Sequence, residues 1–186
     1  GIIDAYDQRG LQIDHAKLFT DIRECIDEAH RDGTVYAAIT SEIERYILRD
    51  AELAPTLHKL RSAGKKLFLL TNSRRPYTEL VMSFLLGSAS AEYPTWRHYF
   101  DACIVAASKP AFFQEHRPLM ERVHEDRDES QMRPAQQLER GKIYEGGNLH
   151  DLERMLGVSG EKVLYVGDHI YGDILRSKKE SSWHTA

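Results

Sequence analysis

The sequence has few cysteines, no long apolar run and no excess of positive charge. Its two cysteines, Cys25 and Cys103, are too few and too unpatterned for a disulfide framework or a zinc site, so a reducing, cytoplasmic setting is expected. No apolar stretch approaches the ~20 residues that a membrane helix needs. The first residues also lack the basic and apolar regions of a signal peptide. We therefore expect a cytoplasmic protein without a membrane partner.

The charge balance bears on the kind of ligand. A net charge of −4 argues against a binder of nucleic-acid polymers, which would need a basic surface for the phosphate backbone. This net charge does not argue against a small anionic ligand, since a local site can be positive on an acidic protein. A length of 186 residues, 41% hydrophobic and 29% charged, is typical of one globular domain, or of one domain with part of another. The number of subunits stays open, and a homo-oligomer is compatible with the sequence.

The N-terminal part, residues 1–48, is predicted to be helical. Asp14 is a suitable N-cap for a helix that runs to about His30 and ends near Gly33. A further helix is expected over about residues 38–48. Four apolar residues of the first helix recur at helical spacing and predict its buried face: Leu18, Ile22, Ile26 and Ala29.

Another face of the same helix carries charged residues. Arg23, Asp27 and His30 stand at i, i+4 and i+7, so their side chains project in one direction. Spacing alone favours a solvent-exposed face with one intrahelical ion pair.

Residues 49–186 alternate between predicted helices and strands. Three apolar runs predict buried strands at residues 66–70, 102–106 and 163–166. Such alternation implies an α/β fold with a parallel sheet built by right-handed crossovers. The helices before and after the first strand are expected to begin near Asp50, burying Ala54, Leu57 and Leu60, and at Pro76. Trp96, Tyr99, Phe100, Phe112 and Phe113 are expected in the core.

Charged residues dominate the segment at about residues 114–141. Glu121 is followed by five nearly consecutive charged residues at positions 125–129. This density predicts a solvated excursion from the core rather than a second domain.

Polar residues follow each predicted strand. They are Thr71, Asn72 and Ser73 after the first strand, Lys109 after the second, and Asp168 with Asp173 after the third. The carboxyl ends of parallel strands share one edge of a sheet, where ligands bind. Taken alone, the two aspartates are explained equally well as a turn residue and a helix cap. Together with a hydroxyl and an ammonium group, they favour a phosphate held beside Mg²⁺.

These segments resemble the haloacid dehalogenase (HAD) superfamily and, within it, the cytosolic purine 5′-nucleotidase-like group. The resemblance rests on Leu69-Leu-Thr-Asn-Ser73, Ala107-Ser-Lys-Pro-Ala-Phe-Phe113 and Gly167-Asp-His-Ile-Tyr-Gly-Asp173. It runs from about residue 18 to the end, and the third segment is the most specific. It implies a three-layer αβα Rossmannoid HAD-like core, partial here, over residues 49–186. Residues 1–48 would be the remnant of a helical cap that binds substrate.

The resemblance also implies roles for these residues. Thr71 and the Asn72 amide would grip the phosphoryl group, with Ser73 beside them and Lys109 as the phosphate-binding lysine. Asp168 would be the Mg²⁺ ligand and Asp173 its supporting carboxylate. Arg23, Asp27 and His30 match a helix that contacts the purine in this group. The resemblance therefore favours recognition of the base over the solvent-exposed face that the spacing alone favours. Arg23 would donate to a purine carbonyl, and Asp27 would accept from a ring N–H.

The first motif of the family has no counterpart. That motif is an apolar strand followed by Asp-x-Asp-x-(Thr/Val), whose first aspartate attacks phosphorus. Asp4 and Asp7 stand three residues apart, and we assign neither to catalysis. Either the chain is a fragment whose first motif lies upstream, which we favour, or it is a catalytically dead relative. Either way we expect marginal folding and no turnover from residues 1–186 alone.

For the intact protein the resemblance implies Mg²⁺-dependent hydrolysis of purine nucleoside 5′-monophosphates such as IMP or GMP, through an aspartyl-phosphate. Two alternatives stay open at this point. One is a non-catalytic module that binds a nucleotide or phosphate, and the other is a HAD phosphatase with a non-nucleotide substrate.

Overall fold

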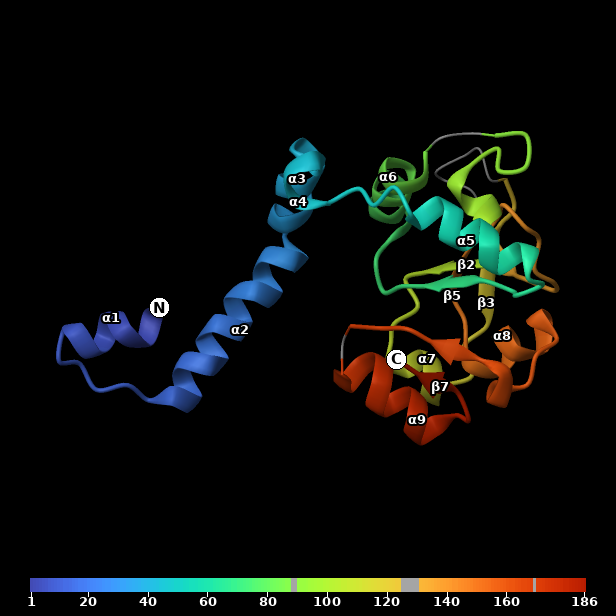
Figure 1. Ribbon diagram of the computed structural model, residues 1–186. Coiled ribbons are helices and arrows are strands. Elements are labelled where there is room, and N and C mark those ends of the chain that lie inside the picture. The colour runs from blue at the N-terminus through green and yellow to red at the C-terminus, as the bar shows by residue number, and fades with distance from the viewer. Residues whose placement is uncertain (88–89, 125–130, 169) are drawn as a thin grey trace. The chain divides into compact units, whose positions relative to one another are not determined.

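A computed structural model describes residues 1–87, 90–124, 131–168 and 170–186, and the chain forms two units, Gly1–Leu48 and Arg49–Ala186 (Figure 1). The smaller unit is helical. Its helices are α1 (Ile2–Gln8), α2 (His15–Arg31), α3 (Thr34–Ser41) and α4 (Ile43–Tyr46). The predicted cap of α2 is confirmed: the Asp14 carboxylate accepts hydrogen bonds from the Ala16 and Lys17 amides, at 3.0 and 3.1 Å.

Two expectations for the smaller unit are wrong. The apolar face of α2 is not buried: Ile22 and Ile26 are exposed, and Leu18 and Ala29 are half-buried. An apolar stripe identifies the side of a helix that favours a partner, but no element among residues 1–48 covers it. The helix expected over residues 38–48 is divided into α3 and α4, because Glu42 leaves the helical conformation with φ −138° and ψ 52°.

The larger unit contains a mixed sheet of five strands in the order β1-β2-β5-β3-β4. Its strands are β1 (Phe68–Leu70), β2 (Ala102–Val105), β3 (Leu119–Arg122), β4 (Met132–Pro134) and β5 (Ile143–Gly146). β1, β2 and β5 are parallel, with Leu70 opposite Ile104 and Ile104 opposite Tyr144. β3 runs antiparallel to both β5 and β4.

Helices cover both faces of this sheet. The helical segments are α5 (Leu53–Ser62), α6 (Arg75–Leu86), a 3₁₀ turn (Trp96–Tyr99), α7 (Ala111–Gln114), α8 (Leu149–Leu156), a 3₁₀ turn (Gly160–Lys162), a π-helical turn (Ile170–Leu175) and α9 (Arg176–Glu180). Figure 1 shows α5 and α6 on one side of β2 and β5, and α7, α8 and α9 on the other. Alternate residues of β2 enter two separate core clusters, Ala102 and Ile104 in one, Cys103 and Val105 in the other. This confirms the predicted three-layer α/β core.

Most predicted core residues of the larger unit are buried. Ala54 and Leu57 of α5 pack against the cluster around Cys103, and α6 begins with Pro76 in its first turn, as expected. The five aromatic residues expected in the core are all buried. Leu60 is the exception, because it lies on the outer side of α5 and is 40% exposed.

The charged segment 114–141 is not simply a solvated excursion. Leu119 and Glu121 of β3 are buried, and this strand pairs with β5 in the sheet. The Glu121 carboxylate accepts a hydrogen bond from Arg133 of β4 at 2.8 Å. Pairing of opposite charges across the two strands therefore stabilises the hairpin of β3 and β4, although its composition is typical of a solvent-exposed segment. The most acidic stretch, residues 125–130, lies outside the described residues.

The third predicted strand does not join the main sheet. β6 (Leu164–Tyr165) pairs in parallel with β7 (His184–Thr185). Among the described residues, β1 and β6 each pair with a strand on one side only. The two sheets contact through side chains, since the rings of Phe68 and Tyr165 stack with centroids 6.3 Å apart. No helix in the described parts of the chain has the length and apolarity to cross a membrane.

Candidate functional site

The loops that follow β1 and β2 are interlocked by backbone hydrogen bonds. The Ala107 amide donates to Thr71 O at 3.0 Å, and the Ala106 amide donates to Ser73 O at 2.9 Å. Both loops leave the carboxyl ends of adjacent parallel strands, so these contacts follow from the register of β1 on β2. The structure thus brings the segment 71–73 against the segment that carries Lys109.

Asn72 has a role that the sequence did not indicate. Its side-chain amide donates to Lys109 O at 3.0 Å, and its side-chain carbonyl accepts from the Lys109 amide at 2.6 Å. This two-point clamp fixes the backbone from which the lysine side chain extends. The backbone amide of Asn72 is then the group with which this residue can meet a phosphoryl oxygen.

The backbone between β2 and Lys109 is strained. Ala106 and Ser108 have φ values of 47° and 59°, in the left-handed region that L-residues rarely adopt. Strain of this kind persists where the surroundings impose it, and it concentrates at ligand sites. Here the clamp from Asn72 and the bond between Ala106 and Ser73 impose the conformation.

Thr71 keeps one hydrogen-bonding capacity for a ligand. Its side-chain oxygen accepts a hydrogen bond from the Ser73 amide at 3.1 Å. A hydroxyl that accepts in this way can still donate its own hydrogen. Thr71 and Ser73 are both half-buried, so each is reachable from solvent.

Lys109 forms a buried ion pair with Asp173. Lys109 Nζ lies 2.7 Å from Asp173 Oδ1, and the two side chains are 11% and 8% exposed. Lys109 Nζ also donates to the Tyr165 hydroxyl at 2.7 Å and to Leu70 O at 3.3 Å. Removing both charges from water is costly, and such additional hydrogen bonds offset part of that cost.

Asp173 is held from several directions. It lies within the π-helical turn that continues into α9, rather than at a helix cap. The Ser177 hydroxyl donates to its backbone carbonyl. Gly167 approaches so closely that a Cβ there would lie 2.6 Å from the Asp173 Cβ. The first glycine of the Gly-Asp…Gly-Asp segment is thus required by close packing against the second aspartate. His169 of that segment lies outside the described residues.

Asp168 and Asp173 are the two carboxylates predicted to lie at a cation site. Asp168 follows β6 and is exposed, whereas Asp173 is buried. Among the described residues, no three His, Cys, Asp or Glu side chains gather as a metal site. Mg²⁺ needs only one or two protein carboxylates when phosphate and water supply its other ligands. The donor set therefore fits Mg²⁺ in company with a phosphate.

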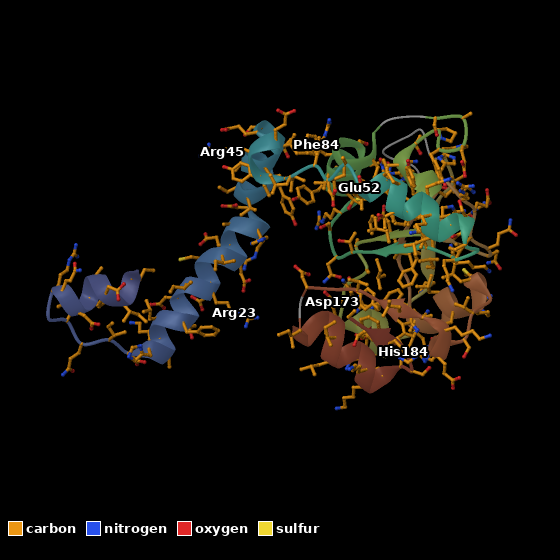
Figure 2. All side chains as sticks on the ribbon, viewed as in Figure 1. Arg23, Arg45, Glu52, Phe84, Asp173 and His184 are labelled. Carbon is orange, nitrogen blue, oxygen red and sulfur yellow. The ribbon has the colours of Figure 1, made fainter. Side chains whose placement is uncertain are left out.

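Arg23, Asp27 and His30 belong to the smaller unit, and Figure 2 shows Arg23 extending from α2. Arg23 Nε lies 3.9 Å from Asp27 Oδ2, and the two side chains are 71% and 58% exposed. His30 Nδ1 is 2.7 Å from Ile26 O, and its ring meets Tyr36 edge to face. All three side chains are exposed, and their common role in binding a ligand stays a prediction.

Sequence reasoning missed Tyr165 and the side-chain role of Asn72. A tyrosine within an apolar strand is a weak signal, because most such residues only pack.

The sequence also holds one Asp-x-Asp string, Asp126-Arg-Asp128. It follows His124-Glu125 instead of an apolar strand, and it lies outside the described residues. It does not replace the absent first motif.

Comparison with known proteins adds independent findings. The family model described as "5′ nucleotidase family" matches residues 1–186. The 5′-nucleotidase domain-containing protein 2 of Homo sapiens is 36% identical over 184 residues, which are 99% of this chain and 34% of that protein. The protein of the same name from Rattus norvegicus is 35% identical over 184 residues, 99% of this chain and 32% of that protein. The chain thus spans about a third of the length of these relatives.

Proposed function

Because the chain belongs to the 5′ nucleotidase family, we propose that the protein containing it hydrolyses purine nucleoside 5′-monophosphates of the IMP or GMP type, and that Mg²⁺ takes part. One observation carries the proposal. Thr71, Lys109 and Asp173 come from three segments, and the hydrogen bonds of Lys109 and the interlocked loops hold them at one edge of the core. A hydroxyl, an ammonium and a carboxylate in this arrangement match the oxygens of a phosphate and the cation beside it.

Each group has a distinct task in this proposal. The Thr71 hydroxyl, the Asn72 backbone amide and the Lys109 ammonium donate to the phosphoryl oxygens. Charge on these oxygens changes during transfer, and donors already fixed by the protein need no reorganisation at that moment. The clamp from Asn72 to the Lys109 backbone supplies this preorganisation.

Mg²⁺ would be held by Asp168, with Asp173 supporting it. When bound, the ion would neutralise charge on the phosphate oxygens. Asp173 already accepts from Lys109 and Tyr165 through Oδ1. Its part is to orient the lysine beside the cation site and to keep the charges of the site balanced.

The attacking group is not in this sequence. We propose that it is an aspartate of the first motif, on a strand of the intact protein that pairs with those edges of β1 and β6 that have no partner strand among the described residues. Leu164 of β6 and Val166, which follows this strand, are apolar and are 61% and 71% exposed. Residues 1–186 alone should therefore be marginally stable and show no turnover.

Turnover and its metal dependence test the proposal directly. The full-length protein should release phosphate from IMP and GMP, lose this activity on treatment with EDTA and regain it with Mg²⁺. Phosphate esters without a nucleoside should be poorer substrates. Binding of the nucleotides without phosphate release would support a non-catalytic module. Faster hydrolysis of esters without a nucleoside would support a phosphatase with another substrate. Either result would contradict the proposal.

We further propose that residues 1–48 form part of a cap and that Arg23, Asp27 and His30 recognise the purine. Arg23→Ala and Asp27→Ala in the full-length protein should each raise KM for IMP by about tenfold, since each removes a hydrogen bond to a charged side chain. KM for p-nitrophenyl phosphate should stay unchanged. The matched control is Arg45→Ala. Arg45 is an exposed arginine of α4 that forms an ion pair with Glu42, the residue before this helix. An equal rise of KM for both substrates would show that the trio does not contact the base.

A further inference from the structure

Tyr165 is a buried titratable residue to which the proposed function gives no task. It ends β6, three residues before Asp168, and it is 6% exposed. Its ring packs against Phe68, Phe113 and Trp183, with centroids 5.7 to 6.3 Å away. Since these neighbours come from three different segments, the ring has a fixed position and its hydroxyl has a fixed direction.

That hydroxyl closes a triangle of hydrogen bonds. Lys109 Nζ donates to the Tyr165 oxygen at 2.7 Å, and the Tyr165 hydroxyl donates to Asp173 Oδ1 at 2.9 Å. Lys109 Nζ also reaches Asp173 Oδ1 directly, at 2.7 Å. Burial, and secondly the bond to Asp173, raise the pKa of Tyr165 above its ordinary value, so the hydroxyl stays a neutral donor.

The triangle has a consequence for Lys109. An ammonium group has three N–H donors, and here they are directed to Asp173, Tyr165 and Leu70 O. A phosphate that binds Lys109 must take over one of these donors. The bond to Leu70 O, at 3.3 Å, is the longest of the three and the easiest to give up.

We propose that Tyr165 is a positioning residue: it holds the Lys109 ammonium beside Asp173, so that the donor now directed to Leu70 O is the one that turns to a phosphoryl oxygen. The inference rests on the proposed function only for the identity of the ligand. Without the hydroxyl, the lysine would have a free donor and a wider range of rotamers. It would then bind phosphate less tightly and in more than one geometry.

Tyr165→Phe in the full-length protein tests this, because phenylalanine keeps the ring and removes only the hydroxyl. The matched control is Tyr144→Phe. Tyr144 is also a buried tyrosine, and its hydroxyl bonds to the Glu139 amide and to Gln137 O, away from Lys109. Tm is recorded for both variants, so that a general loss of stability is separated from an effect at the site.

The first measurement requires neither turnover nor phosphate. Acetic anhydride should acetylate Lys109 about tenfold faster in Tyr165→Phe than in the wild-type protein, as expected for loss of one hydrogen bond to a charged group. Mass spectrometry of the Lys109 peptide gives the rate. Tyr144→Phe should leave it unchanged. Equal rates in Tyr165→Phe and wild type would overturn the positioning role, whatever the enzyme activity.

The second measurement is functional. Tyr165→Phe should lower kcat and weaken inhibition by inorganic phosphate, each by about tenfold, while KM for the nucleotide changes less because the base contacts remain. A change in KM alone would contradict the inference. A wild-type protein without turnover would refute the proposed function, and the acetylation rates would still decide the role of Tyr165.

Discussion

Lys109→Met in the full-length protein should lower kcat/KM for a purine nucleoside monophosphate by about a thousandfold. Methionine keeps much of the side-chain length but removes the ammonium group, now paired with Asp173, that we propose donates to the phosphate. Loss of one preorganised donor in a water-poor site typically costs 10²- to 10³-fold, and here a positive charge is lost as well. Steady-state kinetics with IMP provides the measurement.

Lys142→Met is the control for this variant. Lys142 also lies between carboxylates, those of Glu121 and Glu139, but it precedes β5, at the opposite end of that parallel strand from the site. It should retain kcat/KM within about threefold, since no donor to the phosphate is lost. Similar losses in the two variants would mean that Lys109 acts through stability and not through phosphate binding.

Asp173→Asn should destabilise the full-length protein by about 3 kcal/mol and also remove most of its activity. The substitution keeps the shape of the side chain but leaves the Lys109 ammonium, 11% exposed, without its counter-ion. Removing one partner of a buried ion pair usually costs about 3–5 kcal/mol, because the remaining charge stays desolvated. Urea unfolding at neutral pH measures the change in the free energy of unfolding.

The exposed pair of Glu115 and Arg117 provides the comparison. Its side chains are 49% and 55% exposed, and Arg117 Nε lies 2.7 Å from Glu115 Oε2. Glu115→Gln should therefore change the free energy of unfolding by less than about 1 kcal/mol, because solvent screens such pairs. If Asp173→Asn also changed the free energy of unfolding by less than about 1 kcal/mol, the Lys109–Asp173 ion pair would not contribute to stability as a buried pair does.

Local signals in the sequence predicted local structure well. Asp14 caps α2, and Pro76 lies in the first turn of α6. The apolar run at residues 102–106 is β2, and Phe112 and Phe113 are buried. The cap of α2 and the first turn of α6 depend on residues within one turn of each other, where propensity and capping act. The strand and the buried phenylalanines were predicted from their apolar character.

Patterns that depend on distant partners were predicted less well. The stripe on α2 is apolar, yet residues 1–48 do not bury it. The charged segment forms strand β3, because the Glu121 carboxylate accepts a hydrogen bond from Arg133 on the neighbouring strand and the Leu119 side chain is buried in the core. A high density of charged residues predicts exposure to solvent. Whether such a segment forms a strand depends instead on the strands that lie beside it in the fold.

The sequence by itself determined which residues follow each strand: Thr71 after β1, Lys109 after β2 and Asp168 after β6. Only the tertiary structure decided how they are connected. Lys109 and Asp173 are 64 positions apart, Lys109 and Tyr165 are 56, and Asn72 and Lys109 are 37. Contacts over such separations form only when the sheet order and the packing of the aromatic side chains bring the segments together, and no local pattern records that geometry.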